Sequence, residues 1–92
     1  MKHATETERL FQQVLEETPE DIKMRVDWSF DIANRIDVVL RHNGISQKMF
    51  ANMTGTSEAA VSKWLGGNHN FTLSTLAKIS SALGEPIITV TR

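Results

Sequence analysis

The stretch GISQKMFANMTGTSEAAVSKWLGG, which spans residues 44–67, decides how this chain folds. Its apolar residues recur at helical spacing between serines and glycines. Two short helices are predicted, over about residues 46–53 and 57–65, because a serine precedes each and can cap its first turn. Gly55 can end the first helix and Gly66–Gly67 the second, since glycine tolerates the left-handed conformation that follows a helix.

Two helices of this length joined by so short a turn meet the steric requirements of a helix-turn-helix. Their backbones must approach closely where they cross, and Ala51 is small enough to allow it. The turn needs a residue that can adopt a positive φ, which Gly55 supplies. Apolar side chains must anchor both helices from behind, and the candidates are Phe50, Val61, Trp64 and Leu65.

The opposite face of the second helix is predicted to enter the major groove of DNA. Lys63 can donate to guanine O6 and N7, and Ala59 can contact a thymine methyl group. Glu58 can accept from a cytosine amino group or hold Gln47 in place, while Ser62 can donate or accept. The alternative is that the four side chains of this face form an ordinary solvated surface.

Phosphate contacts are expected around the same helices, because backbone N–H groups at helix N-termini bind phosphate without a strongly basic surface. Lys48 is the candidate for an ionic contact. Other candidates precede or begin the two helices, or follow the second one: Ser46, Gln47, Thr56, Ser57, Asn68, His69 and Asn70.

The residues before this stretch also predict helices. An amphipathic helix is expected over about residues 5–17, with Leu10, Phe11, Val14 and Leu15 on its apolar face. Thr18–Asp21 is typical of a helix start, with a capping hydroxyl, a proline at the first helical position and two acids. A longer helix capped by Asp27 or Ser29 is expected to end at Asn43–Gly44.

After the stretch, Thr72 is expected to cap a last helix that Gly84 closes. Pro86 forbids further helix, and residues 87–91 are rich in β-branched side chains, which predicts a strand. A lone strand leaves its N–H and C=O groups unpaired, so we expect it to pair with the same segment of a second subunit. A strand of another protein and a frayed tail are the alternatives.

Composition narrows the class of protein. The 92 residues contain no cysteine, which rules out disulfides and thiolate metal sites, and the formal net charge is −1. Residues 1–27 carry a net charge of −3 and residues 28–92 of +2, so two surfaces with different partners are indicated. No apolar run is long enough for a membrane span, and we expect a cytoplasmic protein.

Catalytic and metal chemistry find no support in the sequence. The histidines His3, His42 and His69 are widely separated and lack metal-ligand spacing. No nucleophile–base pair or glycine-rich phosphate loop is recognisable, so neither an enzyme nor a cofactor is expected. Trp28 and Trp64 are predicted to be core residues, and Met49 and Met53 are hypothesised to pack beneath the N-terminal helix.

The motif as a whole resembles the helix-turn-helix of the phage-repressor (XRE, Cro/C1-type) family over about residues 28–84. The resemblance implies a lambda-repressor-like, all-α bundle of five helices that binds operators as a dimer. Gln47 then falls at the family's phosphate-contacting glutamine, and the base-reading positions fall on Glu58, Ala59, Ser62 and Lys63. The matching residues are Gly44–Gln47, Phe50–Ala51, Gly55–Ser57, Val61–Trp64, Gly67, Phe71–Leu73, Leu76–Ile79 and Leu83–Gly84.

The flanks divide the chain into an N-terminal helical extension (1–26), a helix-turn-helix domain (27–84) and a C-terminal strand (85–92). This arrangement resembles HigA-type antitoxins, which implies autorepression and a toxin partner, for instance a basic ribonuclease. Two alternatives stay open: a stand-alone repressor without a protein partner, and an interaction module that has lost DNA binding.

Overall fold

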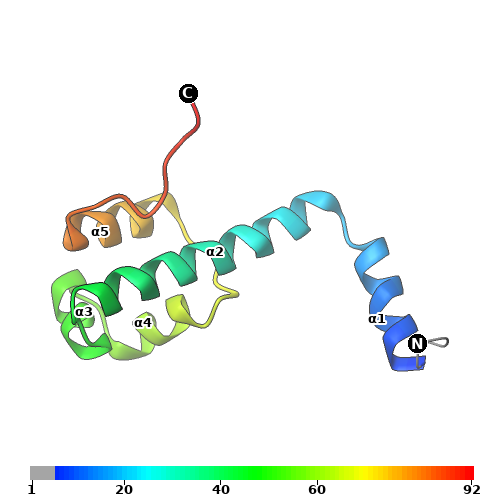
Figure 1. Cartoon of the computed structure of the whole chain (residues 1–92), viewed down its shortest axis with the longest axis horizontal. Coiled ribbons are helices and arrows are strands. Elements are labelled where there is room, and N and C mark those ends of the chain that lie inside the picture. The colour runs from blue at the N-terminus through cyan, green and yellow to red at the C-terminus, as the bar shows by residue number, and fades with distance from the viewer. Residues whose placement is uncertain (1–5) are drawn as a thin grey trace.

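Five α-helices and no strand make up the part of the chain that the computed structural model describes, residues 6–92 with the exception of the Leu15 side chain. This confirms the all-α prediction; His3 lies outside the described residues. Figure 1 shows the helices in order, and their bounds are α1 Glu6–Glu17, α2 Glu20–His42, α3 Gln47–Thr54, α4 Glu58–Leu65 and α5 Leu73–Leu83.

The three C-terminal helices begin where the sequence predicts, because each is capped by a hydroxyl. In every case the oxygen of the capping residue accepts a hydrogen bond from a backbone N–H of the first turn, which has no partner within the helix. The three bonds are 3.1 Å long and join Met49 N–H to Ser46, Ala60 N–H to Ser57 and Thr75 N–H to Thr72.

A single helix, α2, replaces the two segments expected before the helix-turn-helix. The prediction that Thr18 caps a helix is wrong: its hydroxyl donates to the carbonyl of Val14 at 2.7 Å, and Pro19 is the N-cap residue. The prediction of a new start at Asp27 or Ser29 is also wrong. Ser29 donates to the carbonyl of Arg25 at 2.8 Å, which lets a buried serine sit inside an unbroken helix. The expected domain boundary at 26/27 therefore falls within α2.

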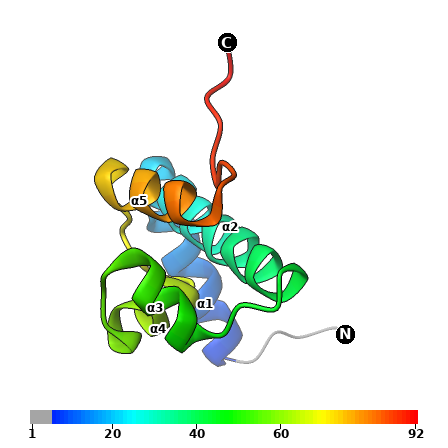
Figure 2. The same cartoon turned by 90° about the vertical axis from the view of Figure 1, so that its left-hand side faces the viewer.

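The core lies where α3, α4 and α5 meet the C-terminal half of α2, as Figure 2 shows from that end of the molecule. Phe50 is fully buried, and its ring meets that of Trp64 edge to face, with centroids 5.9 Å apart and planes at 73°. Trp64 is 5% exposed, which confirms it as a core residue. The other fully buried side chains come from three different helices and are Ile36, Val61 and Ile79.

α1 lies apart from this core, at the far end of α2 (Figure 1). The radius of gyration is 16.6 Å, whereas a compact chain of this length has about 12 Å. The apolar face predicted for α1 is present but uncovered, since Leu10, Phe11 and Val14 are each about 60% exposed. The predicted compact bundle therefore consists of α2–α5 and does not include α1.

Two packing expectations are wrong. Met49 and Met53 do not pack beneath α1: they are 49% and 43% exposed, and α3 and α1 lie at opposite ends of the molecule (Figure 1). Trp28 is not a core residue, because it lines an open groove between α2, α5 and the C-terminal segment and is 59% exposed.

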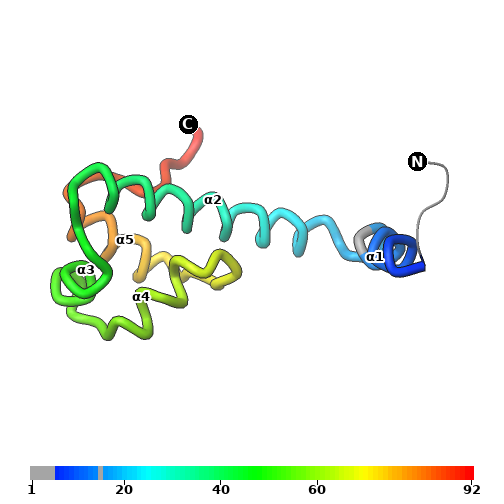
Figure 3. Tube along the Cα trace, turned by 60° about the horizontal axis from the view of Figure 1, so that its bottom comes forward, coloured from blue at the N-terminus to red at the C-terminus, as the bar shows by residue number. Residues whose placement is uncertain are grey.

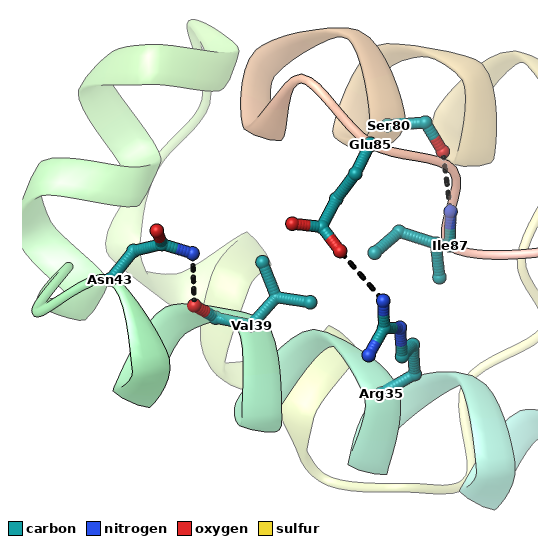
Figure 4. Close-up of polar contacts among 6 residues, drawn as sticks. All are labelled: Arg35, Val39, Asn43, Ser80, Glu85 and Ile87. Carbon is teal, nitrogen blue, oxygen red and sulfur yellow. Dashed lines mark hydrogen bonds and ion pairs between the residues drawn. The ribbon is translucent and has the colours of Figure 1, made fainter.

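The C-terminal segment is not a strand, contrary to the prediction for residues 85–92. β-branched side chains favour a strand only where a neighbouring strand can accept the backbone hydrogen bonds. Instead, Glu85 forms a 2.6 Å ion pair with Arg35, and the N–H of Ile87 donates to the hydroxyl of Ser80 at 3.1 Å (Figure 4). Ile87 is 7% exposed and completes the core.

None of the helices within residues 6–92 combines the length and the apolar character needed to cross a membrane. The same residues contain no cluster of three or more metal-ligating side chains.

Candidate nucleic-acid interface

The turn between α3 and α4 is closed by backbone hydrogen bonds around Gly55. The N–H of Gly55 donates to the carbonyl of Asn52 at 3.2 Å, and the N–H of Thr56 donates to that of Ala51 at 2.9 Å. This pair of bonds is a Schellman motif, which requires a left-handed residue, and Gly55 has φ 68°. Ala51, at the crossing, is 3% exposed, as expected for a small residue between two close backbones.

A buried hydroxyl that the sequence analysis missed also fixes this turn. Thr54 is 6% exposed, and its Oγ1 lies 2.9 Å from the carbonyl of Phe50 and 2.8 Å from the hydroxyl of Thr56. The Phe50 carbonyl can only accept, so the Thr54 proton points to it and Thr56 donates to Thr54. Thr54 follows Phe50 by four residues and Ala51 by three, so it lies on the same helix face as these two buried residues. This spacing could have predicted from the sequence that Thr54 is buried.

α4 is held with one face against the core and the other in solvent. Val61 is fully buried and Trp64 nearly so, whereas Leu65 is half-buried. The structure brings all four predicted base-reading residues together on the exposed side, within an arc of about 140° at 100° per residue. These residues are Glu58, Ala59, Ser62 and Lys63.

The hydroxyl groups of the capping serines are only partly used by the caps. Ser46 and Ser57 are exposed, and each uses its oxygen as an acceptor in a cap, which leaves the proton available. Gln47 and Lys48 are exposed in the first turn of α3. Thr56 differs from the serines, because both its N–H and its hydroxyl proton are engaged within the turn.

The predicted residues after α4 do not form one group. Asn68 is exposed, and His69 is half-buried with its ring 4.8 Å from that of Phe71, edge to face. Asn70 lines a separate groove between α2, α5 and the C-terminal segment. The chain reaches this region through Gly67, which has φ 95° and no room for a Cβ, because such an atom would overlap the ring of Phe30.

Two capped helices, a Schellman turn and a second helix with one polar exposed face define a helix-turn-helix DNA-binding domain. The comparison with known families agrees: the family of Cro/C1-type HTH DNA-binding domains matches residues 35–87, more than half of the chain. The chain therefore belongs to this family and carries the DNA-binding domain of a transcription regulator. No curated protein and no solved structure matches the chain.

The matched region begins at Arg35 and ends at Ile87, so it contains the Arg35–Glu85 ion pair and the last buried core residue. It excludes α1 and the first part of α2. The family match therefore covers the helix-turn-helix and most of its bundle and does not extend to α1.

Proposed function

We propose that the protein binds an operator through α4 as a homodimer and represses the promoter that it occupies. The observation that supports this most is the division of α4 into a buried apolar face and an exposed polar one. A helix face that only contacts solvent needs no particular combination of side chains. Here the exposed face carries a cation, a hydroxyl, a methyl group and a carboxylate, and each of these can contact a different group on the base edges in the major groove.

In the proposed complex, Lys63 donates to guanine, Ala59 contacts a thymine methyl group, and Ser62 and Glu58 read neighbouring bases. Ser46, Gln47, Lys48 and Ser57 contact phosphates and set the orientation of α4. Asn68 and His69 extend the phosphate contacts beyond α4. Thr56 acts on the geometry of the turn, and Asn70 is the least suited of the candidates because it lines another surface.

Two copies on one operator would place their α4 helices in successive major grooves, about 34 Å or a multiple of that distance apart. Doubling the contacts compensates for the small number of cations on the interface of one copy, where Lys48 and Lys63 are accompanied by the acidic Glu58.

A second candidate function, beyond repression alone, is that of an autorepressing antitoxin. It is favoured by α1, an acidic helix with an uncovered apolar face that lies outside the family match. Its four glutamates offer a basic toxin a surface of opposite charge. The absence of a C-terminal strand among residues 6–92 removes the other flanking feature that favoured this role. A stand-alone repressor and an interaction module without DNA binding are the competing functions.

Binding of the purified protein to the DNA upstream of its own gene tests the proposal. We expect affinity to fall linearly with salt concentration on a logarithmic scale, and to exceed the affinity for random DNA of equal length. An interaction module would bind neither DNA. Co-expression with the product of the adjacent reading frame separates the other two functions, because an antitoxin forms a stable complex with that product and a stand-alone repressor does not.

A further inference from the structure

An apolar groove of about 810 Å³ lies on the far side of the bundle from the α3–α4 turn. The middle of α2, the start of α5 and the C-terminal segment form its walls; Figure 1 shows how these three segments are arranged. Several of its apolar lining residues are open to solvent, notably Trp28 at 59%, Leu73 at 78% and Val90 at 77%. Side chains of this size are rarely gathered in solvent on a monomer, and such a surface marks an interaction site.

The chain also contains a helix that fits this groove. α1 carries Leu10, Phe11 and Val14 within an arc of about 100°, and a helix with such a stripe buries it against another element. In the structure it extends away from the bundle at the far end of α2, which Figure 3 shows in a second view. The described contacts therefore leave both the groove and the apolar face of α1 uncovered.

Length and charge agree with this pairing. α1 has 12 residues and is about 18 Å long, and the part of α2 that lines the groove, Arg25 to Arg35, is about 16.5 Å long. α1 contains four glutamates and one arginine, a net charge of −3. The groove is lined by Arg25, which forms no ion pair among the described residues, by Asp31, and by Arg35, whose guanidinium is already paired with Glu85. A glutamate of α1 can therefore pair with Arg25 at the edge of the groove.

We propose that α1 of one copy occupies the groove of a second copy, and that the second α1 occupies the first groove in return. This assignment deepens the proposed function, on which it rests for the homodimer. The occupant is a second copy rather than another protein because every chain provides both the helix and the groove, and reciprocal exchange closes the assembly with two-fold symmetry. α4 lies on the other side of α2 from the C-terminal segment (Figures 1 and 3), so both copies keep α4 exposed.

Charge substitutions with matched controls test the interface through the mass in solution. Phe11→Glu and Leu73→Glu place a carboxylate in the helix and in the groove, and each should convert the dimer into a monomer. Gln12→Glu and Ser74→Glu add the same charge to neighbouring exposed residues and should leave the mass unchanged. All four positions are exposed, so circular dichroism should show that each variant folds.

Disulfide cross-linking tests the same assignment without disturbing it, since the chain has no cysteine of its own. A Val14→Cys chain mixed with a differently tagged Leu73→Cys chain should form a mixed disulfide under mild oxidation. The same Val14→Cys chain mixed with Asn52→Cys, which places the thiol on exposed α3, should not.

Three outcomes overturn the assignment. If both Phe11→Glu and Leu73→Glu remain dimers, the protein is a homodimer but this interface is wrong. A wild-type chain that is monomeric at all concentrations removes the homodimer as well. A Val14→Cys/Leu73→Cys double variant that closes its disulfide within one chain, and whose mixed single variants do not cross-link, shows that α1 folds back onto its own groove. Specific DNA binding is measured in a separate experiment, so a failure of this interface can be distinguished from a failure of the proposed function.

Discussion

The hydroxyl oxygens of Thr54 and Thr56 lie 2.8 Å apart across the turn of the helix-turn-helix. Thr54 is buried and its hydroxyl donates a hydrogen bond to the carbonyl of Phe50, so in the bond between the two threonines the hydroxyl of Thr56 is the donor. The turn that sets the angle between α3 and α4 is therefore fixed by a side-chain bond in addition to the backbone bonds around Gly55.

Thr56→Val should lower the free energy of unfolding by about 1 kcal/mol, the typical net value of one hydrogen bond, and Thr56→Ser should restore it. In a Thr54→Val background the Thr56→Val substitution should have little further effect, because the partner hydroxyl is already gone. Denaturant unfolding of the four variants measures this coupling. Strictly additive losses would mean that the two hydroxyls act independently.

Lys63→Ala should cost roughly 1–3 kcal/mol of binding free energy on the cognate operator if Lys63 makes a good base contact. The loss on random DNA should be smaller, because a base contact contributes only where the correct base is present. Titrations of both DNAs at one salt concentration measure the two values. An equal loss on both would identify Lys63 as a phosphate contact.

Gly67→Ala should destabilise the fold, whereas Gly66→Ala should not. Gly67 has φ 95°, and a Cβ there would overlap the ring of Phe30, while a Cβ at Gly66 would lie at ordinary contact distance, 3.4 Å from the nearest atom. Strain of a left-handed non-glycine residue alone costs about 1–2 kcal/mol. Thermal unfolding compares the melting temperatures of the two variants. Similar values would contradict the left-handed conformation described for Gly67.

The contribution of the C-terminal segment to the free energy of unfolding should come almost entirely from Ile87. Removing residues 88–92 should leave the unfolding free energy of the monomer nearly unchanged, because those residues are exposed and line only the groove proposed for the dimer. Replacing Ile87 by Ala should cost about 2–5 kcal/mol, since its side chain is 7% exposed and belongs to the core. Urea unfolding of both variants gives the comparison; a large loss from the truncation alone would indicate that the segment beyond Ile87 is structured.

The features that could be predicted from the sequence are local ones. The starts of α3, α4 and α5 depend on a hydroxyl and an N–H three residues apart, and their ends depend on nearby glycines, so both are visible in a short window. The division of α4 into a buried and an exposed face follows from the spacing of Val61 and Trp64.

The features that escaped prediction depend on partners far away in the chain. Trp28 is apolar enough for a core, but it lines an open groove between α2, α5 and the C-terminal segment, and no described side chain fills that groove. Residues 87–91 have the composition of a strand, yet no strand within residues 6–92 pairs with them. Thr18 has a hydroxyl suited to a cap, but the carbonyl of Val14 was the nearer partner.

The central claim is that the exposed face of α4 reads DNA, and an NMR titration with the DNA upstream of the gene tests it most directly. Backbone amide signals of Glu58, Ala59, Ser62 and Lys63 should shift with cognate DNA and much less with random DNA of equal length. Signals of the groove, such as those of Trp28 and Leu73, should stay in place. Shifts confined to the groove or to α1, with α4 unaffected, would contradict the account.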